Sequence, residues 1–148
     1  MQDAHQNNNS GEVLISIKDL YKSFEDNHVL QGVNLQVHSK ENVVVLGRSG
    51  TGKSVLIKII CGLLKPDSGI VNVLGKKVAT LNYKELQKFR LQIGFSFQNS
   101  ALYDSMTIKE NLAFPLVRHS KHLTRKEVRA QIESVLDDVG LLQTLNQM

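Results

Sequence analysis

Cysteine, long apolar runs and clusters of metal-binding side chains are scarce in this sequence of 148 residues. Its one cysteine, Cys61, cannot form an internal disulfide, so nothing points to an oxidising compartment, and we expect a buried structural thiol. The longest apolar stretch, residues 55–64, is interrupted by Lys58 and is too short to cross a bilayer. Residues 1–10 are polar and lack the apolar segment of a signal peptide. Any association with a membrane is therefore expected to be peripheral.

The sequence gives little support for a metal site, a nucleophilic enzyme or a basic binding surface. His119 and His122 are close in sequence, but no third ligand follows at a metal-site spacing, so a solvated turn is favoured over a metal site. No arrangement of Ser, His and Asp, or of Cys and His, indicates a nucleophilic enzyme. A basic cluster could contact phosphates or anionic headgroups, but a solvated helix face is favoured because no aromatic side chains interleave with it. The cluster consists of Arg118, Lys121, Arg125, Lys126 and Arg129.

The overall composition is that of an ordinary globular protein, with 41% hydrophobic and 22% charged residues. The length suits one domain with a sizeable core. The formal net charge of +4 suits an anionic ligand, but it also suits a membrane surface or nucleic acid. Charge alone does not decide between these partners.

One motif stands out, because residues 47–54 fit the phosphate-binding pattern G-x-x-x-x-G-K-[ST]. Chance would produce this pattern in roughly one chain in two hundred of this length. The glycines allow backbone conformations with positive φ, so that successive N–H groups can converge on phosphate oxygens. The residues expected to contact the phosphates are Gly47, Arg48, Ser49, Gly50, Thr51, Gly52, Lys53 and Ser54.

The flanks of this motif strengthen the interpretation. The apolar residues 43–46 predict a strand covered on both faces, and residues 53–64 predict a buried helix whose positive N-terminal end favours an anion. Lys53 is expected to reach the β- and γ-phosphates of a nucleotide, and the Ser54 hydroxyl is expected to ligate Mg²⁺. The alternative is a glycine-rich surface turn with an incidental lysine, which this context disfavours.

The remaining sequence predicts alternating strands and helices. Residues 13–17 and 33–37 alternate as two half-buried strands joined by a turn at 25–28, which suggests an antiparallel sheet. Residues 70–74 predict a strand turned by Gly75, residues 83–91 a short polar helix, and residues 93–97 a strand that ends at Gln98. Residues 1–11 have little apolar surface to bury and are expected to be a disordered lead.

Two capping boxes predict helices in the last third of the chain. Thr107 is followed three residues later by Glu110, and Thr124 by Glu127. Pro115 is expected to end or kink the first helix. In the second helix the apolar side chains fall on one face, and Gly140 is placed to stop it.

The order of these features over residues 13–142 resembles the ATP-binding subunit of ABC transporters. The aromatic in Tyr-Lys-Ser-Phe at 21–24 comes first, then Val-Leu-Gln-Gly-Val at 29–33, the glycine loop, Gly-Leu at 62–63 with Pro66 and Gly69, and Phe-Gln at 97–98. Residues 98–107 and 110–116 are similar to the branch that serves phospholipid traffic across the Gram-negative envelope, the Mla-type or toluene-tolerance ATPases.

This resemblance implies an α/β fold with the P-loop NTPase core of an ABC ATPase. An N-terminal antiparallel β subdomain and the start of the helical subdomain would accompany that core. Residues 12–148 are then expected to be a partial nucleotide-binding domain, because they end before the family's signature sequence and its strand ending in Asp-Glu. We expect a fragment that holds ATP, is poorly stable in isolation, and lacks the catalytic acid needed to complete hydrolysis alone.

The resemblance also assigns roles to single residues. Phe24 matches the aromatic on which adenine stacks, with a plain core aromatic as the alternative and Tyr21 as a less favoured substitute. Gln98 matches the glutamine near Mg²⁺ and the attacking water, with ordinary loop chemistry as the alternative. The expected catalytic residues are thus Lys53 and Gln98, and the expected metal ligands are Ser54 and Gln98.

The partners implied by the resemblance are an integral-membrane permease, a second ATP-binding subunit in a homodimer, and a lipid-binding periplasmic component. Residues 99–116 correspond to the surface that receives a short cytoplasmic helix of the permease, with intradomain packing as the alternative. The expected location is the cytoplasmic face of the inner membrane, and no nucleic-acid partner is expected. An ABC ATPase of another import or export system, an ABC ATPase acting on nucleic acid, a P-loop kinase and an inert product remain alternatives.

Overall fold

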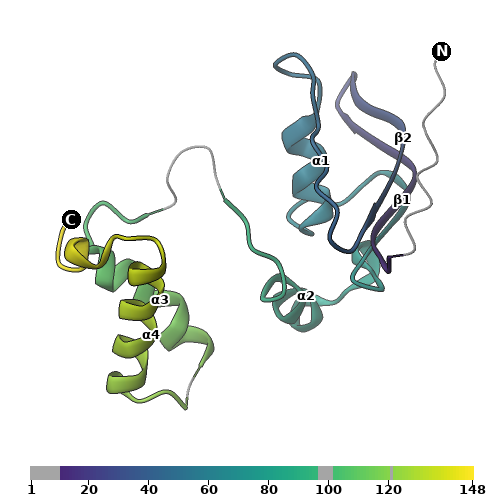
Figure 1. Ribbon diagram of the computed structural model, residues 1–148. Helices are drawn as coiled ribbons and strands as arrows, with labels where there is room; N and C mark the ends of the chain where they lie inside the picture. The colour runs from purple at the N-terminus through teal and green to yellow at the C-terminus, as the bar shows by residue number, and fades with distance from the viewer. Residues whose placement is uncertain (1–10, 97–101, 121) are drawn as a thin grey trace. The chain divides into compact units, whose positions relative to one another are not determined.

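The computed structural model describes residues 11–96, 102–120 and 122–148, which belong to two compact units, Met1–Gly94 and Phe95–Met148 (Figure 1). Within these described ranges, the first unit contains a four-stranded sheet with helices α1 (Lys53–Ile60) and α2 (Tyr83–Arg90), and the second contains helices α3 (Ile108–His119) and α4 (Arg125–Asp138). The predicted disordered lead at 1–11 lies, except for Gly11, outside the described residues. None of the described helices has the length and apolar character that a membrane span requires.

An antiparallel sheet with strand order β2-β1-β3-β4 forms the framework of the first unit. The strands are β1 (Val13–Phe24), β2 (Asn27–His38), β3 (Ser68–Val73) and β4 (Lys76–Lys77). The β1–β2 hairpin turns at residues 25–26, where Phe24 pairs with Asn27. The predicted antiparallel arrangement is therefore confirmed. Both hairpin strands are longer than their alternating patterns indicated, because irregularities in register interrupt the alternation without ending the strand.

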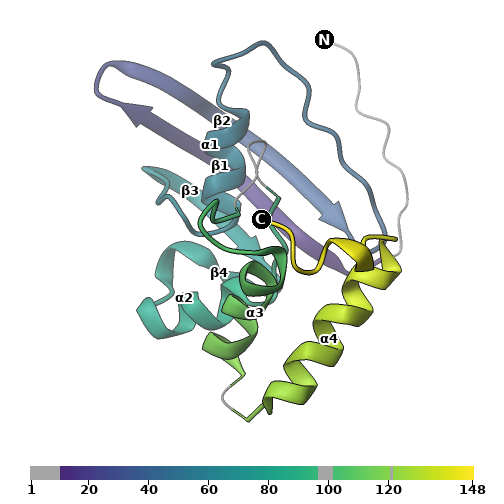
Figure 2. The ribbon, with the colours of Figure 1, turned by 90° about the vertical axis from the view of Figure 1, so that its left-hand side faces the viewer.

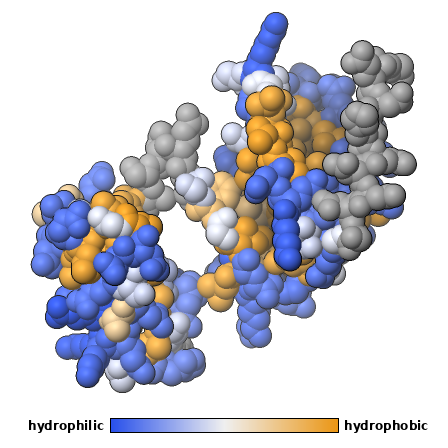
Figure 3. All heavy atoms as spheres, in the orientation of Figure 1, coloured by the Kyte–Doolittle hydropathy of each residue, from blue (hydrophilic) through white to orange (hydrophobic). Residues whose placement is uncertain are grey.

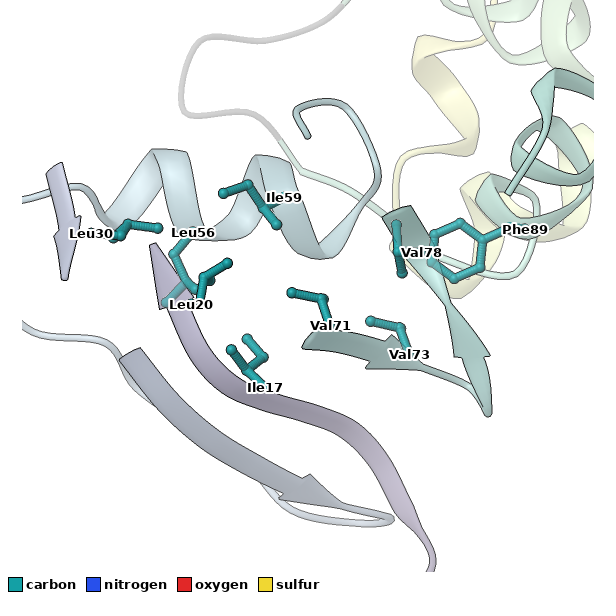
Figure 4. Packing of buried hydrophobic residues seen from close by; sticks show 9 residues of the cluster. All are labelled: Ile17, Leu20, Leu30, Leu56, Ile59, Val71, Val73, Val78 and Phe89. Carbon is teal, nitrogen blue, oxygen red and sulfur yellow. The ribbon is translucent and has the colours of Figure 1, made fainter. Parts of the chain in front are cut away.

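The core of the first unit lies between this sheet and its helices. Helix α1 (Lys53–Ile60) lies across one face of the sheet (Figure 2), and α2 (Tyr83–Arg90) follows the 3-10 turn Val78–Thr80. In Figure 4, Leu56 and Ile59 of α1 face Leu20 and Val71 of the sheet. The cluster consists of Ile17, Leu20, Leu30, Leu56, Ile59, Val71, Val73, Val78 and Phe89. Burial of these apolar side chains fixes α1, and hence the loop before it, relative to the sheet.

The C-terminal end of α1 is held by a cation from α2. The Arg90 guanidinium donates to the carbonyl oxygens of Cys61, at 3.5 Å, and Gly62, at 2.7 Å. A positive charge at this end of a helix is favourable, because the carbonyl ends carry partial negative charge. Cys61 is buried, as predicted, and this burial raises the pKa of its thiol.

The second unit is built on two packed helices, α3 (Ile108–His119) and α4 (Arg125–Asp138), followed by the 3-10 turn Leu142–Thr144. Val128, Ile132 and Leu136 of α4 form its buried centre. Both predicted capping boxes are present, and each threonine accepts a hydrogen bond from the backbone N–H three residues on. A positive φ of 69° at Gly140 follows the end of α4, as predicted.

Pro115 was predicted to end or kink α3, and the helix does not end there. The helix continues to His119, and the N–H of Ser120 donates to the carbonyl of Leu116 at 2.8 Å. Proline removes one hydrogen bond from the helix, but Pro115 is exposed, so the carbonyl left without its usual helix donor can face solvent. The packing of the α3 face against α4 then keeps the helix in one piece.

The predicted buried strand at residues 43–46 is wrong for this structure. The segment has no assigned strand, and the side chains of Val44 and Leu46 are 77% and 87% exposed. A strand needs neighbours for its backbone N–H and C=O groups, and no described strand lies beside this segment. Figure 3 shows apolar surface on the face of the first unit that carries α1 and the segment before it.

Two further predictions need correction. Helix α1 ends at Ile60 instead of Leu64, because Gly62 adopts a positive φ of 66°. The helix is also not buried all round, since Ile57 is 40% exposed. Residues 93–96 form no strand. Phe97 and Gln98, which would end that strand, lie outside the described residues.

Candidate functional site

The glycines of the loop differ in backbone conformation and in the space around them. Gly50 and Gly52 have φ values of 83° and 93°, a region that favours glycine. Gly47 does not have a positive φ, but a Cβ there would lie 2.8 Å from the Thr51 hydroxyl oxygen. The three glycines therefore serve different needs: Gly50 serves conformation, Gly47 serves space, and Gly52 serves both.

Gly52 seats the end of the loop against strand β2. A Cβ at this position would lie 2.8 Å from Cγ1 of Val29 and 2.9 Å from Cδ2 of Leu30. In the hairpin, Leu30 pairs with Lys22 and Asn27 pairs with Phe24. The loop thus packs on β2 within a few residues of the hairpin turn that carries Phe24.

The Lys53 side chain folds back onto the beginning of the loop. Its ammonium nitrogen Nζ donates to the carbonyl oxygens of Gly47, at 2.6 Å, and Arg48, at 2.7 Å. The Thr51 hydroxyl also donates to the carbonyl of Arg48, at 2.9 Å. An ammonium group has three N–H donors, so the loop carbonyls use two and one remains for a ligand. The lysine therefore holds the loop shape and keeps a positive charge at it.

The N-terminus of α1 is suited to an anion. Gly52 is its N-cap and offers no side-chain cap, and the first turn contains no acidic residue. The first N–H groups of a helix have no partner within the helix and carry partial positive charge. Ser54 lies exposed in this first turn, and open space surrounds the Cβ position of Gly50. The backbone donors, the ammonium group and the hydroxyl together fit a magnesium-bound polyphosphate.

Phe24 lies at the end of β1, and its side chain is not part of the buried core. The residue is 45% exposed, and the Lys22 ammonium lies 5.3 Å from the centre of its ring. Tyr21 is 46% exposed and lies against Gly32, where a Cβ would be 3.0 Å from the tyrosine hydroxyl. Of the predicted site residues, Phe24 and those of the loop belong to one unit, whereas Gln98 lies outside the described residues.

Sequence reasoning missed one group near this site, the carboxylate of Asp67. It accepts hydrogen bonds from the Lys22 ammonium and from the backbone N–H of Ser23, both at 2.6 Å. The lysine contact, followed by the Ser23 contact, lowers the pKa of Asp67. Lys-Pro-Asp-Ser-Gly at 65–69 indicated only the end of a helix, because an aspartate in a turn is common and its partner is distant in sequence.

The second unit contains an open groove of about 600 Å³ beside α3. Its apolar surface is partly exposed, with Phe114 at 42% and Val117 at 61%. The ring of Phe114 packs edge-on against that of Tyr103, with 5.6 Å between their centres. The lining residues are Ser105, Met106, Glu110, Ala113, Phe114, Val117 and Arg118.

Asn111 braces the loop that forms one wall of this groove. Its amide oxygen accepts from the N–H of Tyr103 at 2.7 Å, and its amide nitrogen donates to the carbonyls of Tyr103, Met106 and Thr107, each at 3.1 Å. The loop before α3 therefore has a defined conformation. The predicted docking segment, residues 99–116, includes this wall, although residues 99–101 lie outside the described residues.

A glycine loop that opens a helix beside an antiparallel sheet defines the class as a P-loop nucleotide-binding protein. A family model described as ABC transporter matches residues 30–148. The chain therefore belongs to the ABC transporter family, as its ATP-binding domain. This is a family that binds ATP, and the resemblance seen in the sequence is confirmed at this level.

Three curated relatives show the spread of similarity. The chain is 41% identical over 140 residues to the chloroplastic protein TRIGALACTOSYLDIACYLGLYCEROL 3 of Arabidopsis thaliana, covering 95% of this chain and 40% of the relative. It is 40% identical to the probable ribonucleotide transport ATP-binding protein mkl of Mycobacterium leprae, covering 87% of this chain and 37% of the relative. It is 34% identical to the methionine import ATP-binding protein MetN of Mesorhizobium japonicum, covering 93% and 37%. The chain thus spans about two-fifths of the length of these relatives.

Solved structures confirm the fold. A dimeric bacterial ABC transporter cassette has a TM-score of 0.80 and 32% identity, covering 89% of this chain and 60% of that one. A dimeric cassette in a post-hydrolysis state, bound to ADP and Pi, has a TM-score of 0.79 and 31% identity, with the same coverage. The α/β P-loop fold of an ABC ATPase is therefore established for this chain.

Proposed function

We propose that this chain is the nucleotide-binding part of a subunit that couples the binding and hydrolysis of Mg-ATP to the transport of lipid across or between membranes. The observation that carries the proposal is the loop at 47–54, with the Lys53 ammonium bound to its first carbonyls and an uncapped helix N-terminus behind it. Backbone donors, an ammonium and a hydroxyl are the groups that a magnesium-bound triphosphate requires.

In this proposal the site residues divide the work as follows. The N–H groups of residues 48–54 and the Lys53 ammonium hold the β- and γ-phosphates, and the Ser54 hydroxyl holds the metal ion. Bound Mg²⁺ would neutralise the negative charge that develops as the γ-phosphate is transferred to water. Gln98 would orient that water and contact the metal. Phe24 would hold the adenine ring by stacking, for which its exposed ring offers surface.

The groove beside α3 supports a permease as partner. Its wall is held by Asn111, and its partly exposed apolar side chains suit a short amphipathic helix. In the complete protein, a second ATP-binding subunit would complete a homodimer, and a lipid-binding periplasmic component would exchange lipid with the permease. The subunit would then be peripheral, at the cytoplasmic face of the inner membrane.

A lipid as transported substrate is supported by two observations. The relative at 41% identity is named for trigalactosyldiacylglycerol, a lipid, and it is similar over 95% of this chain. Residues 98–107 and 110–116, some of which line the groove, also resemble the phospholipid branch in sequence. A second candidate, a cassette for a small polar solute, is favoured by the similarity to the ribonucleotide and methionine transport proteins.

The nucleotide site is tested by titrating a fluorescent ATP analogue with Mg²⁺ into the chain and two lysine variants. Lys53→Ala should weaken binding at least tenfold, because it removes the ammonium from the loop. Lys58→Ala is the matched control, because this exposed lysine lies in the same helix and outside the loop. Equal affinities of parent and Lys53→Ala would refute the site.

Permease docking is tested by co-purification with a candidate ABC membrane subunit co-expressed with this chain. Val117→Asp should weaken the association, because it places a charge in the apolar groove. Val139→Asp is the control, because Val139 has almost the same exposure, 62% against 61%, and lies outside the groove. If both variants retain the permease equally, the groove is not its docking site.

A further inference from the structure

The last residues of β1 are held on one edge by an aspartate instead of a strand. On its other side, β1 pairs with β2 as far as Phe24, opposite Asn27. Pairing with β3 ends earlier, where Tyr21 lies opposite Ser68. Beyond that point, Asp67 takes over: its own N–H donates to the carbonyl of Tyr21 at 3.1 Å, and its carboxylate accepts from the N–H of Ser23 at 2.6 Å.

The approach of Asp67 to β1 is fixed by the backbone beside it. Gly69 has a φ of 97°, and a Cβ there would lie 2.3 Å from the carbonyl oxygen of Asp19. Asp19 itself has a positive φ of 45°, at an irregularity in the β1–β3 register. Only glycine allows the two backbones to come so close. The close packing of these two backbones therefore fixes where Asp67 lies, and with it the position of its carboxylate.

Lys22 connects this carboxylate to the aromatic ring. Its ammonium lies 2.6 Å from an oxygen of Asp67 and 5.3 Å from the centre of the Phe24 ring. The lysine side chain is only 14% exposed, so its stem is packed and its head has a defined place. A cation over one face of an aromatic ring is attracted by the negative face. Phe24 is 45% exposed, so its ring keeps surface on which a flat ligand can stack.

We propose that Asp67 and Lys22 are positioning residues for the nucleobase: Asp67 fixes the end of β1, and Lys22 orients the Phe24 ring so that its exposed surface receives the base. This inference rests on the proposed function, because it assumes that Phe24 stacks on a bound nucleotide. The two positioning residues form a Lys-Asp pair outside the phosphate loop, with Lys22 in β1 and Asp67 in the turn before β3.

The test compares Mg-ATP with magnesium tripolyphosphate, which has the phosphates but no base. Asp67→Ala and Lys22→Met should weaken ATP binding by about 2- to 10-fold, the usual worth of one aromatic stacking contact. Tripolyphosphate affinity should stay unchanged, because neither residue touches the loop. Asp26→Ala is the matched control: it removes a carboxylate from the adjacent hairpin turn, and Asp26 makes none of these contacts.

A second measurement does not require ligand. The chain contains no tryptophan, so Phe24→Trp introduces a single fluorescent reporter at the ring position. Adding Asp67→Ala should lower the steady-state anisotropy of that reporter, whereas adding Asp26→Ala should not. Circular dichroism checks that each variant keeps the fold.

The possible outcomes distinguish a failure of the positioning role from a failure of the nucleotide site. Equal loss of ATP and tripolyphosphate affinity, or unchanged ATP affinity and anisotropy in Asp67→Ala, would overturn the positioning role while leaving the nucleotide site in place. Failure of the parent chain to bind either compound would remove the proposed function and the base-stacking part of this inference together. Lowered anisotropy would still support the placement of the ring by Asp67.

Discussion

At the scale of single residues, two glycines of the phosphate loop differ in what surrounds them. Gly50 and Gly52 both have positive φ, but a Cβ at Gly50 would have no atom within 4 Å, whereas one at Gly52 would press on Val29 and Leu30. Gly52→Ala should therefore lower the free energy of unfolding by about 2–4 kcal/mol, and Gly50→Ala by only about 1 kcal/mol. Urea unfolding of both variants measures the difference, and equal losses would contradict the described packing of the loop on β2.

Asn111 is another residue whose replacement should lower stability, because its side chain bonds the backbone of a loop. Its side chain bonds backbone groups of the loop from Tyr103 to Thr107, and truncation leaves the N–H of Tyr103 and the carbonyl of Met106 without this partner. The carbonyls of Tyr103 and Thr107 keep backbone donors. Asn111→Ala should cost about 1–3 kcal/mol of stability in the second unit. Asn146→Ala provides a control, because Asn146 is exposed and has no side-chain role in this loop. A change in thermal stability no larger than that of the control would show that the loop does not depend on this amide.

The residues of the site were predictable to different degrees. The loop at 47–54 was recognisable, because glycine, lysine and serine at fixed spacing have few other uses. The two contacts from Lys53 to the loop carbonyls were not, because they depend on how the loop folds back on itself. Asp67 was missed because its partners, Lys22 and Ser23, are more than 40 residues away and meet it only through the sheet.

At the scale of elements, the helices of the second unit begin with capping boxes that also respond to pH. The Thr124 hydroxyl and N–H lower the pKa of Glu127, and the Thr107 N–H and hydroxyl lower that of Glu110. A carboxyl group whose pKa is lower in the folded state stabilises it above the unfolded-state pKa, and this contribution disappears as the pH falls through the folded-state pKa. Helix content should therefore fall on acidification below the usual glutamate range of about 4.3.

Replacing both threonines tests this directly. Thr107→Ala with Thr124→Ala should cost about 1 kcal/mol per helix at neutral pH, and the acid-dependent loss of helix should become smaller. Circular dichroism at 222 nm between pH 7 and pH 3 follows the change. An unaltered pH profile in the double variant would show that the capping boxes do not contribute.

Sequence patterns predicted elements well where the information is local. Capping boxes and alternating strands depend on neighbours a few residues away, and both appeared as expected. Residues 43–46 were different, since an apolar run becomes a strand only when other strands supply its hydrogen bonds. Of the two effects predicted for Pro115, an end to the helix is absent, because the packing of α3 on α4 outweighs one lost hydrogen bond.

At the scale of the whole molecule, the first unit carries an exposed apolar segment beside the phosphate loop. Leu46 is 87% exposed, so Leu46→Asn should change the free energy of unfolding by no more than about 0.5 kcal/mol while reducing self-association. Leu56→Asn is the contrast, because Leu56 is 6% exposed and its replacement should cost several kcal/mol. Light scattering and urea unfolding provide the two readouts, and a large loss of stability in Leu46→Asn would mean that the segment is buried in solution.

The proposed function of the chain depends on the binding of a magnesium-bound triphosphate at residues 47–54. Isothermal titration calorimetry of Mg-ATP into the parent chain, Lys53→Ala and Lys58→Ala is the most direct measurement. We predict one binding site in the parent and in Lys58→Ala, and at least tenfold weaker binding in Lys53→Ala. Binding of equal strength in all three proteins, or no heat of binding in the parent, would contradict the account.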